Sequence, residues 1–213
     1  MNIVLIGASG YVGSAILKEA LDRGHHVTAV VRDPEKLPRH PCLYPRKADI
    51  SQEGEVAKVV AGHEAVISAF NPGWSNPDIY TQQIKGTRAI INGAKKVGIR
   101  RLLFVGGAGS LEVQPGIQAL DRPDFPKEYK QGALATREAL AHLRQEADLE
   151  WSYVSPSADL FPGSRTGHFR VGTDEMLKDA NGASRISVQD YAMAMIDELE
   201  NPAHVRKRFT IGY

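Results

Sequence analysis

The sequence predicts an α/β protein with a doubly wound parallel sheet. Three observations support this fold class. Short apolar runs rich in β-branched residues alternate with amphipathic helical stretches along the chain. The first run, residues 2–6, leads directly into a glycine-rich turn and then into a helix. No internal repeat, low-complexity tract or linker divides the chain, so residues 1–213 are expected to form a single domain.

The elements follow from periodicity along the chain. Strands are expected where apolar or β-branched residues run together, and helices where apolar residues recur every three or four positions. The expected strands are residues 2–6, 26–31, 43–47, 65–70, 101–105, 151–154, 168–171, 185–187 and 208–211. The expected helices are residues 14–23, 52–61, 78–97, 126–146 and 188–200, with Ser51 as the N-cap of the second.

The turn after the first strand reads Gly7-Ala-Ser-Gly10-Tyr-Val-Gly13. Strand, glycine turn and helix are the setting that a dinucleotide-binding fingerprint requires, although glycine also serves ordinary turns. Gly7 permits a tight turn, Gly10 lets the backbone approach a pyrophosphate, and Gly13 lets the helix pack on the strand. The helix N-terminus then offers amides and a partial positive charge to the phosphates. The predicted cofactor-binding residues of this turn are Gly7, Ser9, Gly10, Tyr11, Val12 and Gly13.

Arg32 ends the second strand, 25 positions after Gly7, where a Rossmann unit meets the adenosine ribose. An acidic side chain there binds the 2′-hydroxyl of NAD, whereas a basic one suits the 2′-phosphate of NADP. Arg32 therefore favours NADP(H) over NAD(H). A preference for NAD(H) stays open if Asp33 turns inward. The remaining alternative is that Arg32 is simply solvated and contacts no cofactor. Asp49 either accepts a hydrogen bond from the adenine amino group or caps a turn.

Ligands of open α/β sheets lie outside the carboxyl ends of the strands. Ala69, Phe70 and Asn71 end the fourth strand and are expected to border the cofactor. Trp74 and Tyr80 follow them and are candidates for walls of the site, although aromatic side chains more often serve packing.

The later strands complete the expected crevice. Gly106 and Gly107 follow the fifth strand and would let a nicotinamide ring approach the backbone, and Ser155 ends the sixth strand as a further cofactor-binding residue. Ser110 is a candidate hydroxyl beside the reacting centre. Residues 112–127 and 157–184 are expected to form lid or substrate segments around this crevice.

Several motifs of the chain resemble the atypical short-chain dehydrogenase/reductases. They are residues 7–13, 31–34, 105–110 and 190–192. Residues 124–130 and 154–157 support a narrower resemblance, to the bacterial NAD(P)H-binding proteins labelled NADH-flavin reductases, relatives of the nitrogen-metabolite-repressor-like and flavin/biliverdin reductases. The resemblance covers essentially the whole chain. It implies a Rossmann-type sheet with a small C-terminal substrate or lid region, and NAD(P)H as the cofactor.

Conventional members of that superfamily use a Tyr-x-x-x-Lys pair on a helix, in which the lysine lowers the pKa of the phenol. Tyr129 instead has Ala133 four positions later, and its neighbour Lys130 points to a different helix face. This departure fits hydride transfer to a flavin-like or quinone-like acceptor, whose chemistry belongs to the cofactor and the acceptor. The flavin would be a substrate rather than a bound prosthetic group. The candidate catalytic residues are Ser110, Tyr129 and Lys130.

Two other functions stay open at this point. One is a non-catalytic NADP(H)-binding redox sensor. The other is a sugar-nucleotide epimerase or dehydratase, for which the roughly sixty residues after the sixth strand leave little room.

Composition narrows the classes of partner. Lys and Arg number 26 and Asp and Glu 25, so no basic excess indicates nucleic acid or a polybasic anchor. No apolar run has membrane-spanning length, and the N-terminus lacks a signal-peptide pattern. Cys42 is the single cysteine, which excludes an internal disulfide and a cysteine metal cluster. We expect a cytoplasmic monomer or homodimer with a small-molecule acceptor and no metal, nucleic-acid or membrane partner.

Overall fold

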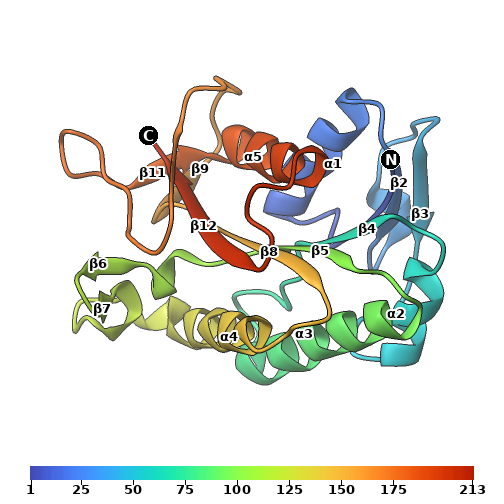
Figure 1. The fold of residues 1–213 in the computed structure, drawn as a ribbon, viewed down its shortest axis with the longest axis horizontal. Helices are drawn as coiled ribbons and strands as arrows, with labels where there is room; N and C mark the ends of the chain where they lie inside the picture. The colour runs from blue at the N-terminus through green and yellow to red at the C-terminus, as the bar shows by residue number, and fades with distance from the viewer.

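One large sheet organises the protein, as a computed structural model of residues 1–213 shows (Figure 1). Its strands are β1 (Asn2–Ile6), β2 (His26–Val30), β3 (Leu43–Arg46), β4 (Ala65–Ser68), β5 (Arg101–Val105), β8 (Glu150–Ser155), β10 (Arg170–Gly172) and β12 (Lys207–Gly212). Their order is β10-β12-β8-β5-β4-β1-β2-β3. All neighbours are parallel except β10 and β12, which run antiparallel. The order changes direction between β1 and β4, so the predicted Rossmann-type doubly wound sheet is confirmed.

Helices cover both faces of this sheet. They are α1 (Tyr11–Asp22), α2 (Glu53–Val60), α3 (Ile79–Lys96), α4 (Lys127–Arg144) and α5 (Val188–Glu200). Helices α1 and α5 lie above the sheet in Figure 1, and α2, α3 and α4 lie below it. Along β1, Ile3 and Leu5 point into the upper core, whereas Val4 and Ile6 point into the lower one, because successive strand residues face opposite sides. None of the helices combines the length and apolarity needed to cross a membrane.

Helix α1 begins earlier than predicted. The sequence predicted a start at Ser14, after the last glycine, because glycine disfavours helix interiors. The structure starts the helix at Tyr11, with Gly10 as the N-cap and Gly13 inside the first turn. Close packing of the helix on the preceding turn, described below, is the reason that a glycine lies at this helical position.

The two predicted lid segments contain three short strands that the sequence did not reveal. They are β6 (Glu112–Gln114), β7 (Ile117–Gln118) and β9 (Asp159–Phe161), whereas β11 (Arg185–Ser187) follows the second segment at the residues predicted for a strand. β6 and β7 form an antiparallel hairpin, and β9 pairs in parallel with β11. Strands of two or three residues are too short to show an alternation of apolar and polar positions. A β-bridge between Glu112 and Glu175 connects the two segments.

Candidate functional site

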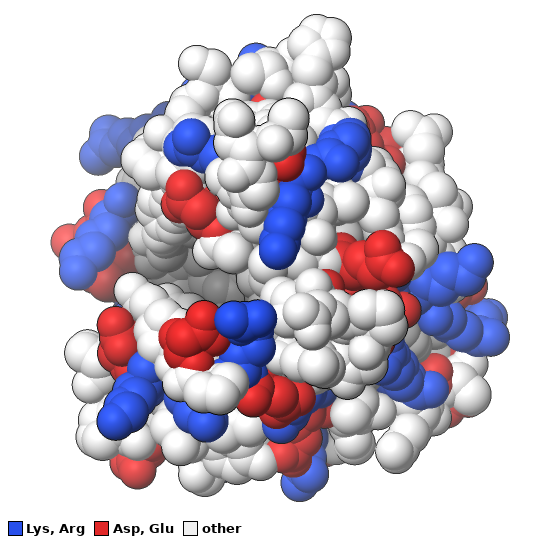
Figure 2. All heavy atoms as spheres, turned by 90° about the vertical axis from the view of Figure 1, so that its left-hand side faces the viewer, with Lys and Arg blue, Asp and Glu red and all other residues white.

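The carboxyl ends of β5 and β8 point towards one side of the molecule. In Figure 1 this is the left-hand side, where β5 leads towards β6 and β8 leads towards β9. Figure 2 looks onto that side and shows a hollow with an uncharged interior and charged side chains along its rim. The change of direction between β1 and β4 also falls at this edge of the sheet, and ligands of doubly wound sheets bind at such a point.

The turn from β1 to α1 leaves no room for a side chain at Gly7 or at Gly13. Gly7 has a φ of +83°, which residues with a Cβ rarely adopt, and a Cβ there would lie 2.5 Å from the carbonyl oxygen of Ala69. A Cβ on Gly13 would lie within 3.0 Å of the carbonyl oxygen of Gly7. Gly10 is less crowded, because a Cβ there would meet that oxygen at 3.3 Å. Only glycine at the first and third positions permits these backbone contacts.

The first turn of α1 presents backbone donors. No side chain caps this helix, and no acidic residue lies in its first turn. The first intrahelical bond reaches back to the N-cap, so the amides of Tyr11, Val12 and Gly13 have no intrahelical partner. Ser9 is exposed just before them. Open N–H groups at the positive end of a helix dipole fit a phosphate, so the turn suits the pyrophosphate of a dinucleotide.

Arg32 follows β2, and its side chain is exposed without a hydrogen bond or an ion pair to the protein. Its neighbour Asp33 does not turn inward. The Asp33 carboxylate accepts a hydrogen bond from Glu35 N at 3.3 Å and caps the short 3-10 helix Pro34–Lys36. This contact leaves Arg32 as the residue at this strand end that is free to meet an anion.

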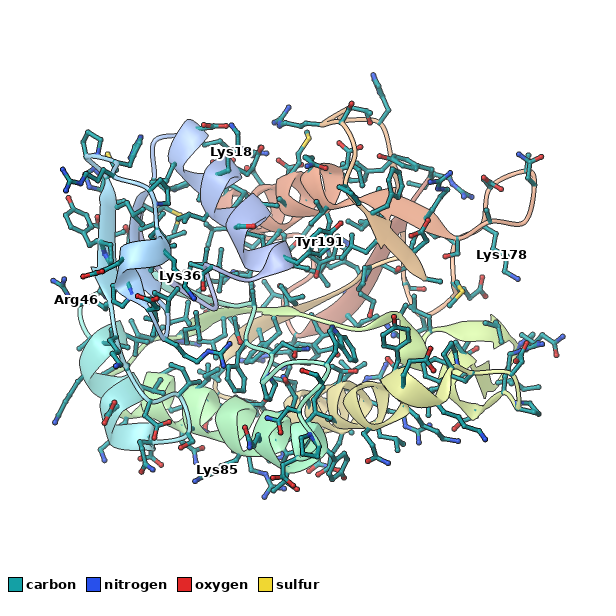
Figure 3. The ribbon with its side chains drawn as sticks, turned by 180° about the vertical axis from the view of Figure 1, so that it is seen from behind. Lys18, Lys36, Arg46, Lys85, Lys178 and Tyr191 are labelled. Carbon is teal, nitrogen blue, oxygen red and sulfur yellow. The ribbon has the colours of Figure 1, made fainter.

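Two more cations lie close to Arg32. Arg46 ends β3 beside it, since Val31 N donates to Arg46 O at 3.0 Å, and Lys36 lies in the 3-10 helix, with its Nζ 3.6 Å from Asp33. Figure 3 shows Lys36 and Arg46 on the same side of the molecule, opposite the end that carries Lys178. The ends of β2 and β3 therefore carry a cluster of cations, at the end of the molecule away from Lys178, and this cluster suits an anionic group.

Asp49 caps the turn that leads into α2. Its carboxylate accepts a hydrogen bond from Ser51 N at 2.9 Å, and hydrogen bonds from Ser51 lower its pKa. The prediction of Ser51 as a helix N-cap is therefore wrong, because Ser51 belongs to this turn and Gln52 is the N-cap of α2. Of the two roles considered for Asp49, turn capping is visible in the structure.

The end of β4 forms the floor of the crevice. Ala69 lies against the glycine turn, and Asn71 is exposed. The ring of Phe70 packs on α3 where a Cβ on Gly86 would lie within 3.0 Å of it. Buried Gln83 donates from Nε2 to Phe70 O at 3.2 Å, whereas its Oε1 has no partner in the protein. An unpartnered buried acceptor beside a strand end can receive a donor from a ligand.

The end of β5 packs tightly on its neighbours. A Cβ on Gly106 would lie within 3.0 Å of the Tyr153 ring, and one on Gly107 would lie 2.8 Å from Thr136 Oγ1. Burial raises the pKa of Tyr153 to about 12, and its hydroxyl donates to Thr136 O at 2.9 Å. Burial also raises the pKa of Tyr191, labelled in Figure 3, whose hydroxyl donates to a β8 carbonyl at 2.7 Å. Neither phenol is accessible to a ligand.

The two serines predicted at this end lie below the surface. Ser110 is 2% exposed, and its Oγ accepts a hydrogen bond from Arg208 Nη1 at 3.3 Å. Ser155 is fully buried, and its Oγ lies 3.5 Å from the same Nη1 atom. Arg208 is held in turn by Asp174, from the second lid segment, through Nε at 2.7 Å. The Arg208 guanidinium thus lies in the protein interior and contacts residues that follow β5 and end β8.

Tyr129 and Lys130 lie in the first turn of α4, and both are exposed. Tyr129 contacts Trp74 with ring centroids 5.3 Å apart, whereas Lys130 has no ion-pair partner. Tyr80 does not join this wall, because its hydroxyl donates to Glu138 in a separate groove between α3 and α4. The structure therefore brings two of the three candidate catalytic residues to the surface, whereas Ser110 is buried.

The second lid segment lies against α1. The hydroxyl of Tyr11, in the first turn of α1, donates to Leu160 O at 3.3 Å. Burial, followed by the negative charge of Asp159, raises the pKa of Tyr11. Farther along the helix, Arg165 pairs with Glu19 at 2.8 Å. The start of α1, beside the glycine turn, and the second lid segment are therefore in direct contact.

Asp190, at the start of α5, anchors the same segment. Its carboxylate accepts hydrogen bonds from Thr166 N at 2.8 Å, Thr166 Oγ1 at 2.6 Å, Gly167 N at 2.9 Å and the Tyr213 hydroxyl at 2.7 Å. Burial acts to raise the pKa of Asp190, but these hydrogen bonds outweigh it and lower the pKa below its usual value. The ionised carboxylate thus holds the loop in place.

Sequence reasoning missed Arg46, Gln83 and Arg208 at this site. Arg46 could have been found by aligning the ends of the second and third strands. Gln83 and Arg208 carry no local signal, because the first lies in a helix and the second in a late strand, and only the tertiary packing brings them to the crevice.

A glycine turn, an open helix terminus and a strand-end crevice define a Rossmann-type dinucleotide-binding protein. Residues 7–202 match the family described as NAD(P)H-binding. The chain belongs to this NAD(P)H-binding family, and its predicted place among the atypical short-chain dehydrogenase/reductases is confirmed.

Relatives of similar length support this assignment. YwnB of Bacillus subtilis is 40% identical over 99% of this chain and 98% of its own. The crystal structure of a "putative epimerase" from Bacteroides thetaiotaomicron is 51% identical, with a TM-score of 0.94 over 100% of this chain and 96% of its own. That of a "putative NADH-flavin reductase" from Streptococcus pneumoniae is 34% identical, with a TM-score of 0.86 over 100% of this chain and 99% of its own.

Proposed function

We propose that the protein is an NAD(P)H-dependent reductase of a flavin-like or quinone-like acceptor. When bound, the reduced nicotinamide supplies a hydride from C4, which carries two electrons to the acceptor ring, and solvent supplies the proton that completes the reduction. The acceptor binds and leaves as a substrate. The protein positions two rings in contact and keeps water away from them.

This proposal rests on one observation: the hydroxyl groups at the ends of β5 and β8 already have hydrogen-bond partners within the protein. Tyr153 and Tyr191 donate to backbone carbonyls, and Ser110 accepts from Arg208 in the protein interior. Reduction of a carbonyl to an alcohol needs an acid placed beside the oxygen. A flavin or a quinone needs none, because its ring delocalises the incoming charge. The relative named as an NADH-flavin reductase supports the same acceptor class.

The residues of the chain divide the work of binding. The open amides of Tyr11, Val12 and Gly13 hold the pyrophosphate, and the strand end at Gly106 and Gly107 receives the nicotinamide. Ser110, supported by Arg208, keeps that strand end in place. Tyr129 and Lys130 meet the acceptor from the start of α4.

We propose NADPH as the preferred donor. Arg32 is exposed and unpaired, Asp33 is engaged in a cap, and Arg46 and Lys36 add positive charge. An arginine fork matches the oxygens of a 2′-phosphate. The ribose 2′-hydroxyl of NADH has no carboxylate to meet at this position, because Asp33 turns away.

Two other functions receive less support. An epimerase or dehydratase of the short-chain type needs an acid–base pair, and no tyrosine of the chain is followed by a lysine four positions later. A redox sensor without turnover is favoured by one contact, that of Tyr11 with Leu160, which connects the phosphate-binding turn to the lid segment.

The test is oxidation of NADPH in the presence of FMN, FAD or quinones, followed by loss of nicotinamide absorbance. We expect turnover with at least one acceptor and none with Gly10→Arg, whose side chain fills the phosphate cradle. Lys18→Ala is the matched control on α1, since Lys18 is exposed and pairs only with Asp22. Tight NADPH binding without turnover on any acceptor would overturn the reductase and favour the sensor.

A further inference from the structure

The β4–α3 loop and the start of α4 hold an exposed aromatic pair, Trp74 and Tyr129. The two side chains are 53% and 47% exposed. Their ring planes meet at 84°, which is the edge-to-face arrangement that aromatic pairs prefer. Two adjacent exposed rings form an apolar patch, and patches of this kind mark binding sites for ligands or partners.

Trp74 is held in place by the structure around it. A Cβ on Gly132 of α4 would lie within 3.0 Å of Cζ3 of the indole, and 3.1 Å from Cδ1 of Ile79. The loop is also fixed before the tryptophan, because Asn71 Oδ1 accepts from Gly73 N at 2.7 Å. The indole therefore has a defined position, with its benzo edge on α4 and about half of its surface open.

The aromatic pair stands beside the carboxyl end of β5. Tyr129, Ala133 and Thr136 share one face of α4, at spacings of four and three residues. A Cβ on Gly109 would lie 2.9 Å from Ala133 Cβ, and one on Gly107 would lie 2.8 Å from Thr136 Oγ1. Tyr129 is one turn farther towards the helix start, about 6 Å along the axis. The two rings thus border the strand end that receives the nicotinamide in the proposed function.

We propose that Trp74 and Tyr129 form the acceptor-binding wall and bind the planar ring of a flavin or a quinone. This inference rests on the proposed function and assigns the acceptor to a place in the crevice. A flat conjugated ring buries large apolar area against tryptophan and tyrosine without needing specific hydrogen bonds. Lys130, exposed and unpaired next to Tyr129, attracts an anionic substituent such as the phosphate of FMN.

The two tryptophans of the chain make the test direct. Trp74 is 53% exposed and Trp151 is 2% exposed, so a ring bound at the wall quenches the emission of Trp74 first. FMN is titrated into the protein saturated with NADP⁺, in which no turnover occurs. We expect saturable quenching in the wild type and its loss in Trp74→Phe, which keeps a ring but removes the indole.

Substitutions in the aromatic pair test the same proposal through the affinity for FMN. We expect Trp74→Ala and Tyr129→Ala to raise the Kd for FMN by about tenfold or more, with the Kd for NADPH changed by less than about twofold. Gly132→Ala, which displaces the indole without removing it, is expected to act in the same direction. Tyr44→Ala is the matched control, because Tyr44 is an equally exposed aromatic residue that stacks on His26 far from β5.

The outcomes separate this inference from the proposed function. Unchanged FMN affinity in Trp74→Ala and Tyr129→Ala overturns the aromatic wall, and turnover by the same variants then leaves the reductase standing. Trp74-dependent FMN binding in a protein that oxidises NADPH with no acceptor supports the wall and overturns the reductase. Absence of saturable quenching by FMN and by a quinone in the wild type overturns the wall.

Discussion

The two ends of the crevice present their groups to a ligand in opposite ways. The end proposed to bind the phosphates, called here the phosphate end, is formed by residues 7–13. There Gly7 and Gly13 leave no room for a side chain, and backbone amides are open. The end proposed to receive the nicotinamide, called here the nicotinamide end, is formed by the ends of β5 and β8. Its hydroxyls are buried and engaged, and aromatic side chains reach the surface beside it. The proposed function thus assigns phosphate binding to the backbone at one end and acceptor binding to aromatic rings at the other.

Under the proposed function, this difference lets the fold bind the cofactor without providing an acid catalyst. The phosphate end depends on close contacts of the main chain, which tolerate no added atom. The nicotinamide end depends on side chains whose polar atoms already have partners, so their role is support.

The largest effect is expected for Gly13→Ala. The new Cβ would lie within 3.0 Å of a backbone oxygen that is fixed by the turn, so the free energy of unfolding should fall by at least about 3 kcal/mol, the upper range of core overpacking. Urea unfolding measures this change. Gly54→Ala in α2 is the control, since a Cβ there meets nothing within 4 Å and should change stability by less than about 1 kcal/mol. Equal effects of the two variants would contradict the close packing of α1.

Asp190→Asn tests the anchor of the segment that contacts the phosphate end. The pKa of Asp190 is lower in the native state than its usual value of about 3.9, so the ionised carboxylate stabilises the fold above that pH. Its contribution is lost as the pH falls through the native pKa. We expect the variant to lose about 1–3 kcal/mol at neutral pH and to show a flatter acid limb of stability against pH.

Thermal unfolding between about pH 3 and pH 7 measures this dependence. Asp22→Asn is the control, because Asp22 is exposed and pairs only with Lys18, and its removal should change stability by less than about 1 kcal/mol. A wild-type acid limb in Asp190→Asn would show that other carboxylates set the pH dependence.

Arg32→Ala tests whether side-chain recognition supplements the backbone at the phosphate end. Loss of a charge-assisted bond to the 2′-phosphate should weaken NADPH binding by about 10- to 100-fold, with NADH binding changed by less than about twofold. Calorimetry with both nucleotides measures the difference. Arg100→Ala, before β5 at the opposite edge of the sheet, should change neither. Equal weakening of both nucleotides by Arg32→Ala would mean that this guanidinium does not hold a 2′-phosphate.

The smallest effect is expected for Ser110→Ala. Its hydroxyl lies in the interior and accepts a bond from Arg208, so kcat should fall by less than about threefold, against the 10²- to 10⁴-fold that a positioned acid contributes. Steady-state kinetics with the best acceptor measures this. A loss of about a hundredfold would place Ser110 in the chemistry and remove the contrast between the two ends.

The sequence predicted the sheet and the glycine turn between β1 and α1 well, because local sequence patterns define both. The apolar runs define β1, β2, β4 and β5, and the glycine spacing at residues 7–13 defines the turn. It failed at Ser51 and at the start of α1, because propensity does not report which side chain caps a turn or when packing requires a glycine inside a helix.

The nicotinamide end could not be predicted to the same degree. Arg208 comes from the last strand, Asp174 from a lid segment and Ser110 from the end of β5, and no spacing in the sequence connects them. The pairing of Trp74 with Tyr129 depends likewise on a contact between a loop and a distant helix. Residues that meet only through tertiary packing leave no periodic signal.

The exposure of Trp74 and Tyr129 also bears on how acceptor choice can evolve. A side chain that is half in water contributes little to the stability of the fold, so replacing it leaves the protein intact. Gly7 and Gly13 allow no such drift. If the aromatic wall binds the acceptor as proposed, a lineage with this architecture can exchange acceptors through one or two surface substitutions while its cofactor stays the same, and libraries randomised at residues 74 and 129 offer a short route to new specificity.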